Sequence, residues 1–392
     1  MGHFATGNCY RITQLFLVNR RYCTNLLFSR VFIVGYGLWE WLLFVQGSSC
    51  IETLSWLRGH MNKKSKGRLT IDWELTGRQY GSLNFPWSRN ESAWGSLQIP
   101  VIVIKNGKGP FILLTGGNHG DEYEGPIALS NLARALDVQR VTGTICIVPA
   151  LNYPALKSGT RLSPIDGLNM NRAFLGRAEG TITEQIAHFV EAELISRADA
   201  VLDIHAGGRT MFFQPFAVSH QLPDEAQTLR AREALIAFGA PIGLILEELD
   251  NEGMLDTAVE QKGKLFLSTE LGGGGSTTAA TVKLAQDGAH NFLVHTGVYD
   301  AAMKTPATPV SIMENEANGY VSAQTSGFIE FTHELGDGVE AGQVIARIHD
   351  FENLHKEPEA ILAPVTGTLL GRHFGGHITK GDFLAMFASP EN

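Results

Sequence analysis

Histidine and glutamate side chains follow two predicted strands at a spacing that suits a metal ion. His119 and Glu122 lie in a glycine-rich loop with two residues between them, and His205 ends another apolar run. An imidazole and a carboxylate at this spacing can both reach one cation at about 2 Å, and a third ligand leaves a fourth tetrahedral position for water, as in catalytic zinc sites. A His-x-x-Glu pair alone is more often a hydrogen-bonded surface pair, so the prediction depends on His205. Asp203 either orients an imidazole or points away from His205.

A zinc hydrolase also needs a base near the attacking water, and Glu270 is the leading candidate. It follows the apolar run 264–269 and precedes four glycines, residues 272–275, which let backbone approach a ligand. A glutamate there can take a proton from water and pass it to a leaving amine. The alternative is a glutamate that only caps or pairs at the rim.

Two arginines and one asparagine lie between Glu122 and His205, around the loop that contains Pro164 and Gly167. They are Arg161, Asn171 and Arg172. A guanidinium is a planar bidentate donor, which suits a small carboxylate or a developing oxyanion. Without the metal motif, these residues would be solvated loop charges.

Short apolar runs alternate with longer helical patterns from residue 63 onward, which predicts an α/β fold with a mostly parallel sheet flanked by helices. Ligands gather at the carboxyl ends of such strands, so the loops after residues 114, 204 and 268 are where we expect the site. The predicted strands are 101–104, 111–114, 145–148, 201–204 and 265–268, and the predicted helices are 126–136 and 184–197.

A second unit is predicted over residues 317–392, after a hydrolase domain over 61–316. The pattern of residues 326–346 returns at 366–385, with glycines at turns, which indicates a pseudo-symmetric all-β sandwich. The segment resembles the biotinyl/lipoyl type, but no lysine occupies a tight hairpin between the copies. We therefore expect it to shape or shield the main site.

The first 60 residues differ in composition from the rest. They contain no lysine and no aspartate but three of the four cysteines, and residues 31–45 are apolar apart from Glu40. Arginines before this run make it resemble a secretory signal, with a weak cleavage site at 47–50. The favoured interpretation is upstream sequence, with Met61 opening the normal protein and residues 1–60 outside the fold.

Composition excludes several classes of function. A net charge of −9, from 31 Lys+Arg and 40 Asp+Glu, disfavours nucleic acid as a partner. The apolar run near the N-terminus is too short to span a membrane comfortably.

Four cysteines are too few for a disulfide framework, which favours a cytoplasmic location, and Cys146 is expected in the core. The sequence lacks a Gly-x-Ser-x-Gly elbow and a phosphate-binding loop, and it leaves the oligomeric state open, a homo-oligomer included.

Four motifs together resemble the aspartoacylase and succinylglutamate desuccinylase family, whose catalytic domain has the zinc carboxypeptidase fold. They are residues 119–122, 171–174, 203–205 and Glu270, within a resemblance over about 100 to 300. The resemblance implies one Zn²⁺ per chain and a small N-acyl amino acid as substrate. It assigns zinc to His119, Glu122 and His205, proton transfer to Glu270, carbonyl polarisation to Arg161, and substrate contacts to Asn171 and Arg172.

Residues 115–128, 148–155 and 268–275 further resemble a branch of the family that deacetylates N-alpha-acetyl-L-2,4-diaminobutyrate in ectoine degradation. The acidic stretch 247–252, with Asp256, is either the partner of that substrate's ammonium or a solvated loop. Other N-acyl amino acids, of the N-acetylaspartate or N-succinylglutamate type, are the alternative substrates. A metal- or ligand-binding protein without turnover is the non-enzymatic alternative.

Overall fold

The computed structural model describes residues 32–35, 41–44, 65–246 and 252–391. The chain divides into two compact units, residues 1–63 and 64–392. In the first, β1 (Phe32–Gly35) pairs antiparallel with β2 (Trp41–Phe44). The predicted cleavage site at 47–50 lies outside the described residues. The site and the remaining elements belong to the second unit.

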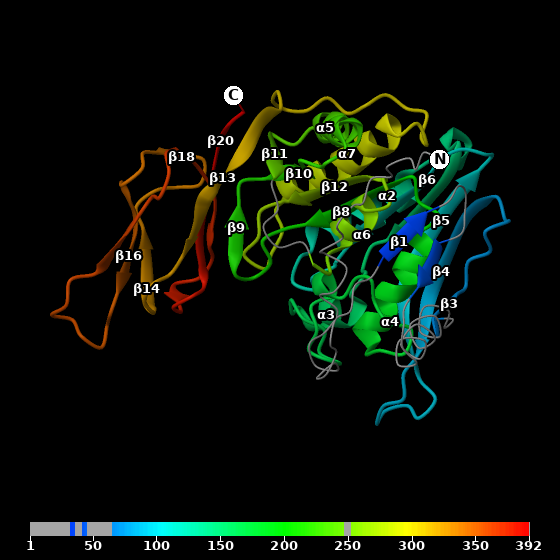
Figure 1. Ribbon diagram of the computed structural model, residues 1–392, viewed down its shortest axis with the longest axis horizontal. Helices are drawn as coiled ribbons and strands as arrows, with labels where there is room; N and C mark the ends of the chain where they lie inside the picture. Colours follow the sequence, from blue (N-terminus) through cyan, green and yellow to red (C-terminus); the bar gives the residue numbers. More distant parts are fainter. Residues whose placement is uncertain (1–31, 36–40, 45–64, 247–251, 392) are drawn as a thin grey trace, which may run out of the picture. The chain divides into compact units, whose positions relative to one another are not determined.

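A mixed sheet forms the centre of the second unit (Figure 1). Its middle strands are parallel, in the order β7-β6-β8-β12. Antiparallel neighbours flank them, with β5, β4 and β3 on one side and β10 on the other, where β11 and β13 run parallel to β10. The bounds are β3 (Arg68–Leu69), β4 (Gly77–Pro86), β5 (Ser96–Asn106), β6 (Phe111–Gly116), β7 (Gly143–Val148), β8 (Ala200–His205), β10 (Phe216–His220), β11 (Ile242–Leu246), β12 (Leu265–Glu270) and β13 (Ser311–Ser322). All five predicted strands are confirmed.

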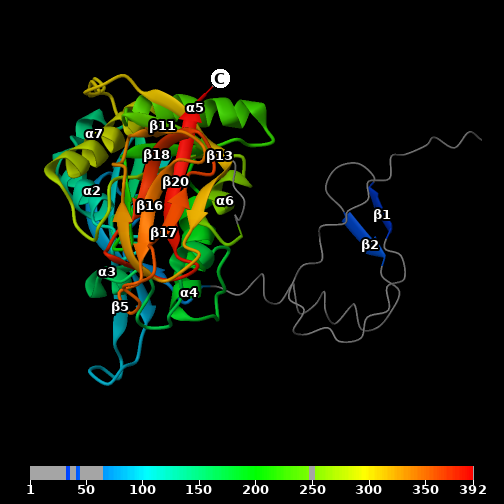
Figure 2. The ribbon, with the colours of Figure 1, turned by 90° about the vertical axis from the view of Figure 1, so that its left-hand side faces the viewer.

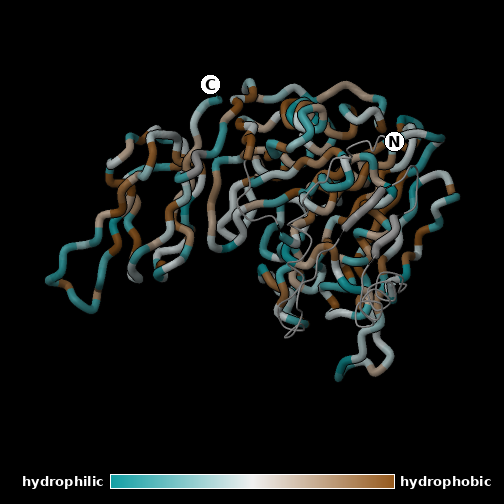
Figure 3. The backbone as a smooth tube through the Cα atoms, in the orientation of Figure 1, coloured by the Kyte–Doolittle hydropathy of each residue, from teal (hydrophilic) through white to brown (hydrophobic). Residues whose placement is uncertain are grey.

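Helices cover both faces of this sheet, which explains why its strands are continuous apolar runs and not alternating ones. Ile112 and Leu114 of β6 belong to one core and Leu113 to the other. In Figure 1, α5 and α7 lie above the central strands and α4 lies below them, and hydrophobic residues follow these strands in Figure 3. The bounds are α2 (Glu124–Ala135), α3 (Tyr153–Ser158), α4 (Ile182–Phe189), α5 (Glu225–Phe238), α6 (Leu255–Glu260) and α7 (Ala279–His295).

Both predicted helices are confirmed. The first is α2, and the second is α4 continued by a π-helical turn, η3 (Val190–Ile195). The short 3-10 turns are η1 (Val138–Arg140) and η2 (Met170–Arg172). Cys146 is buried in the core as expected, and burial raises the pKa of its thiol to about 12. None of the helices in the described ranges is long and apolar enough to cross a membrane.

The C-terminal strands continue the central sheet and add a second one (Figure 2). β13 pairs with β11 through residues 311–314 and with β20 through 313–322, so the predicted boundary at residue 316/317 falls inside a shared strand. The two copies of the sequence repeat appear as a strand, a short strand and a strand each. The first is β14 (Gly327–Phe331), β15 (Gly338–Val339) and β16 (Val344–His349), the second is β18 (Gly367–His373), β19 (His377–Ile378) and β20 (Phe383–Pro390), and β17 (Glu359–Leu362) lies between them.

A substitution at Gly288 in α7 tests how tightly α7 packs against α5. A Cβ atom added there would lie 2.3 Å from the ring of Phe238 in α5. Gly288→Ala is expected to lower the free energy of unfolding by about 1 to 3 kcal/mol through overpacking, more than the gain of about 1 kcal/mol in helix propensity. Thermal and urea unfolding measure this, with Gly376→Ala, which meets no atom within 4 Å, as the control. Equal stability of the two variants would contradict it.

Candidate metal centre and active site

Three neighbouring parallel strands bring the predicted site residues together at their carboxyl ends. His119 and Glu122 lie in the loop between β6 and α2, His205 is the last residue of β8, and Glu270 is the last residue of β12. His205 and Glu270 are direct neighbours in the register of β8 and β12. The predicted position at the strand ends is therefore confirmed for these residues.

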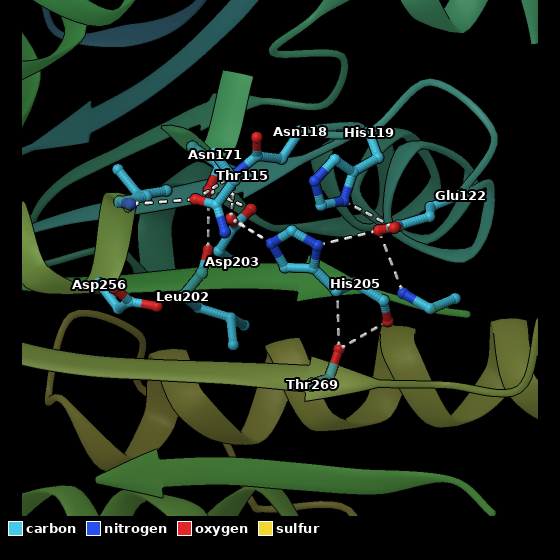
Figure 4. A network of polar contacts seen from close by, with 12 residues as sticks. Thr115, Asn118, His119, Glu122, Asn171, Leu202, Asp203, His205, Asp256 and Thr269 are labelled. Atoms are coloured by element: carbon cyan, nitrogen blue, oxygen red, sulfur yellow. Dashed lines mark hydrogen bonds and ion pairs between the residues drawn. The ribbon is translucent and has the colours of Figure 1, made fainter. Parts of the chain in front are cut away.

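The carboxylate of Glu122 lies between the two imidazoles (Figure 4). Its Oε1 is 2.7 Å from Nδ1 of His119, and its Oε2 is 2.9 Å from Nδ1 of His205. All three side chains are buried, and one ligand atom from each lies within 4.8 Å of the others. The group has the composition and spacing of a His-Glu-His metal site.

Hydrogen bonds on the far side of each ring determine which nitrogen carries hydrogen. Nε2 of His205 lies 2.7 Å from a carboxylate oxygen of Asp203, and Nε2 of His119 lies 3.2 Å from Oδ1 of Asn169. The Asn169 atom is an oxygen because it also accepts the backbone N–H of Asn171. Both Nε2 atoms are therefore donors, and in a neutral ring Nδ1 is then an acceptor.

Two acceptor nitrogens thus face the two oxygens of one carboxylate, which accepts as well when ionised. This arrangement is repulsive unless a proton or a metal ion lies between the partners, and a metal bound through Nδ1, Nδ1 and a carboxylate oxygen satisfies all three groups. The donor set therefore fits a zinc ion, whose ligands are imidazole nitrogen and carboxylate oxygen.

The pKa shifts of the group also place a positive charge beside Glu122. Burial lowers the pKa of His119, which favours the neutral ring that a metal requires. Burial alone would raise the pKa of Glu122, but the two imidazoles bring it well below its usual range. Burial likewise opposes protonation of His205, yet the carboxylates of Asp203 and Glu122 raise its pKa well above the ordinary value. The pocket thus favours one positive charge beside the Glu122 carboxylate.

A buried polar network supports His205 from behind. Asp203 accepts hydrogen bonds from Nε2 of His205 at 2.7 Å, from Thr115 Oγ1 at 2.7 Å and from Asn118 Nδ2 at 2.9 Å. Its carboxylate therefore faces His205, and of the two predicted orientations the structure has the one that orients the imidazole. Asn118 Nδ2 also donates to Asn171 Oδ1 at 3.2 Å, which links the network to a predicted substrate residue.

The predicted substrate residues Asn171 and Arg172 occupy different environments. Asn171 is buried, and its side-chain oxygen also accepts the backbone N–H of Leu255 at 3.0 Å, at the start of α6. The side-chain oxygen of Asn171 therefore accepts its hydrogen bonds from groups of the protein itself. Arg172 is exposed, and its Nη1 donates to the carbonyl of Asn171 at 2.7 Å.

Glu270 and Arg161 lie beside the metal ligands. Oε2 of Glu270 is buried and accepts no hydrogen bond from the described residues. Burial, followed by the negative charge of Glu122, raises the pKa of Glu270 to about 8, so this carboxyl group can gain and lose a proton near neutral pH. Arg161 Nη1 lies 3.5 Å from Glu122 Oε1, and its side chain is 40% exposed, so it can also face a ligand.

Several residues of the site were not predicted because they act through contacts between strands and loops. Thr115, Asn118 and Asn169 support the ligands, and Thr269 Oγ1 lies 3.1 Å from both the backbone nitrogen and the carbonyl oxygen of His205. For Thr115, Asn118 and Thr269, their positions in the motifs 115–128 and 268–275 were the only signal. In the predicted acidic stretch, residues 247–251 lie outside the described residues, Glu252 is exposed and Asp256 is buried in the first turn of α6.

Comparison with known proteins identifies the family. Residues 108–296 match the succinylglutamate desuccinylase/aspartoacylase catalytic domain. The chain is 45% identical, over 81% of its length and 94% of the relative, to N-alpha-acetyl-L-2,4-diaminobutyric acid deacetylase of Halomonas elongata.

Two solved structures are similar over their whole length. The product-bound ectoine utilization protein EutE (DoeB) from Ruegeria pomeroyi is 43% identical over 83% of this chain, with a TM-score of 0.80. A succinylglutamate desuccinylase from a Silicibacter species is 42% identical over 84% of this chain, with a TM-score of 0.81. The fold, the site and these relatives define a hydrolase. The chain belongs to the succinylglutamate desuccinylase/aspartoacylase family, which confirms the resemblance seen in its motifs.

Asp203→Asn is expected to weaken metal binding while leaving all three ligands in place. The amide loses the negative charge behind His205, and its NH₂ group would face donors that now bond to the carboxylate. We expect metal affinity to fall about 10- to 100-fold. Competition with a chromogenic zinc chelator measures this, with the exposed Asp300→Asn as a control. Unchanged affinity would show that Asp203 does not support the site.

Proposed function

We propose that the chain is a zinc-dependent deacetylase that converts N-alpha-acetyl-L-2,4-diaminobutyrate to diaminobutyrate and acetate. The observation that carries this is the buried His119-Glu122-His205 group beside Glu270, in a chain 45% identical to a deacetylase of that name. The similarity to an ectoine utilization protein supports the same substrate. One Zn²⁺ would be held by these three side chains.

A zinc ion held there supplies Lewis acidity, which lowers the pKa of water and polarises a carbonyl group. Glu270 removes a proton from the attacking water and delivers it to the amide nitrogen as the C–N bond breaks and a C–O bond forms. Its raised pKa suits both steps, since the carboxyl group must accept and release one proton in each turnover.

Arg161 is the donor for the carbonyl oxygen of the acyl group. Its guanidinium lies beside Glu122 with part of its surface open, so it can stabilise negative charge that develops on that oxygen. Asn171 and Arg172 contact the substrate in this proposal. Because the side-chain oxygen of Asn171 is occupied, its NH₂ group is the part offered to a ligand.

The proposal extends to the organisation of the chain. A zinc-carboxypeptidase-like hydrolase domain extends to β13, and the strands after β13 form a sandwich of the biotinyl/lipoyl type, with residues 1–60 outside the fold. The repeated strand pattern and the shared apolar core of the C-terminal strands support the sandwich. The low cysteine content supports a cytoplasmic location.

Glu270→Gln separates proton transfer from metal binding. Glutamine keeps the shape of the side chain but cannot accept a proton, so kcat should fall about 10²- to 10⁴-fold while zinc content stays at that of the parent. Steady-state kinetics and metal analysis measure both quantities. The exposed Glu233→Gln on α5 is the matched control. If kcat stays at the parental value, Glu270 is not the general base, and another carboxylate has that role.

Substrate charge tests the choice of diaminobutyrate. Its side chain ends in an ammonium, whereas aspartate and glutamate derivatives end in a carboxylate, so the two classes need opposite charges at the far end of the site. We expect kcat/KM for N-alpha-acetyl-diaminobutyrate to exceed that for N-acetylaspartate and N-succinylglutamate. Acetate and succinate release over the three substrates measures this. Comparable kcat/KM values for the three substrates would contradict the diaminobutyrate assignment but would leave the assignment as a hydrolase in place.

A further inference from the structure

A cavity of about 350 Å³ lies between α2, α7 and the segment that follows α7. Sites for small molecules have volumes of about 300 to 1,000 Å³, so the cavity is large enough for a small ligand. The two helices pack side by side (Figure 2). Leu132 and Leu136 line the cavity from the side of α2, His290 lines it from α7, and Tyr299 and Lys304 line it from the following segment.

The cavity and the active site lie at opposite ends of α2. Glu124, in the first turn of α2, comes two residues after the metal ligand Glu122, and its Oε1 lies 3.3 Å from Oγ1 of Thr281 in the first turn of α7. Leu132 lies in the last turn of α2, and Leu136 is its C-cap. A helix of 12 residues is about 18 Å long, so a ligand of the cavity is distinct from the substrate.

Hydrogen bonds hold the segment after α7 in place at the cavity. Asn291 is buried in α7, its Nδ2 donates to the carbonyl of Lys304 at 3.0 Å, and its Oδ1 accepts the backbone N–H of Lys304 at 2.6 Å. Nε2 of His290 lies 3.0 Å from the carbonyl oxygen of Ala302. The wall that carries Lys304 is therefore ordered before a ligand binds, which lowers the entropic cost of binding.

Two cations at the cavity are available to a ligand. Arg140, in η1, and Lys304 both line the cavity and are exposed. Within the described part of the chain, neither side chain lies within ion-pair distance of a carboxylate. Asp287 also lines the cavity, but it is paired with Lys283 one turn earlier in α7. The cavity thus combines an apolar wall with two cations.

We propose that this cavity is a second ligand site, which binds a small organic anion. The charged end of the ligand is bound by Arg140 and Lys304, and its apolar end packs against α2. A guanidinium offers two parallel donors to a carboxylate or a phosphate, and an ammonium adds a compact positive charge. The site is separate from the metal ligands and from Glu270, so the inference does not depend on the proposed function.

Protection of the Lys304 amine measures binding at the cavity itself. The zinc-loaded full chain is propionylated with an N-hydroxysuccinimide ester at increasing concentrations of benzoate, and mass spectrometry gives the rate at Lys304. Benzamide, a neutral molecule of the same shape, is the matched ligand. Half-maximal protection is expected at an about 10-fold lower concentration of benzoate, as for one charged hydrogen-bonded contact. The exposed Lys380 is the internal reference and should keep its rate.

Arg140→Met separates charge from shape, because methionine keeps an alkyl stem and removes the donors. The preference for benzoate over benzamide should largely disappear in this variant, while zinc content and kcat stay at the parental values. Arg230→Met, at an exposed arginine of α5, is the matched control and should keep the preference. Ala135→Glu, at an exposed residue that lines the cavity, adds a carboxylate and should weaken protection by benzoate but not by benzamide.

Phenyl phosphate in a further arm distinguishes the two kinds of anion. Stronger protection by phenyl phosphate assigns a phosphate to the ligand, and stronger protection by benzoate assigns a carboxylate. The inference is overturned if neither anion protects Lys304, or if benzamide protects it equally well. A parental preference for benzoate in both Arg140→Met and Ala135→Glu would overturn it as well.

Discussion

The placement of one carboxylate between two acceptor nitrogens is the constraint on which the site depends. Glu122 faces Nδ1 of both His119 and His205, while the opposite nitrogens donate to Asn169 and Asp203. With the ring hydrogens of the neutral imidazoles on the far side, the three groups repel one another unless a proton or a metal ion joins them. The buried network around Asp203 thus gives the pocket its preference for a metal, before any substrate is present.

The sheet places the proposed general base beside the metal ligands. Parallel pairing of β8 with β12 puts Glu270 beside His205, and it buries Glu270 where its pKa rises to about 8. Loops from distant parts of the sequence then supply the cations, with Arg161 against Glu122 and Arg209 between Gly159 and Gly275. Guanidinium groups suit the carboxylate of an N-acyl amino acid or the oxyanion that develops on its acyl group.

The C-terminal strands are connected to this arrangement by hydrogen bonds. β9 (Met211–Phe213), six residues after His205, pairs with β18, and the backbone N–H of Phe374 donates to Thr210 at 2.8 Å. The ring of Phe374 lies 2.9 Å from where a Cβ atom of Gly274 would be. The C-terminal strands therefore contact both the loop after His205 and the loop after Glu270.

The sequence by itself determined the parts that depend on local pattern. Apolar runs bounded by glycine predicted β6, β8 and β12, because strands buried on both faces are continuous apolar segments. His119, Glu122, His205 and Glu270 could be selected because each follows such a run. Only the tertiary structure decided the direction of Asp203, the use of the Asn171 side chain and the position of Arg209. Those depend on hydrogen bonds and close backbone approaches between segments that are 50 or more residues apart, as the 85-residue separation of Asn118 and Asp203 shows, and neither periodicity nor motif spacing encodes such contacts.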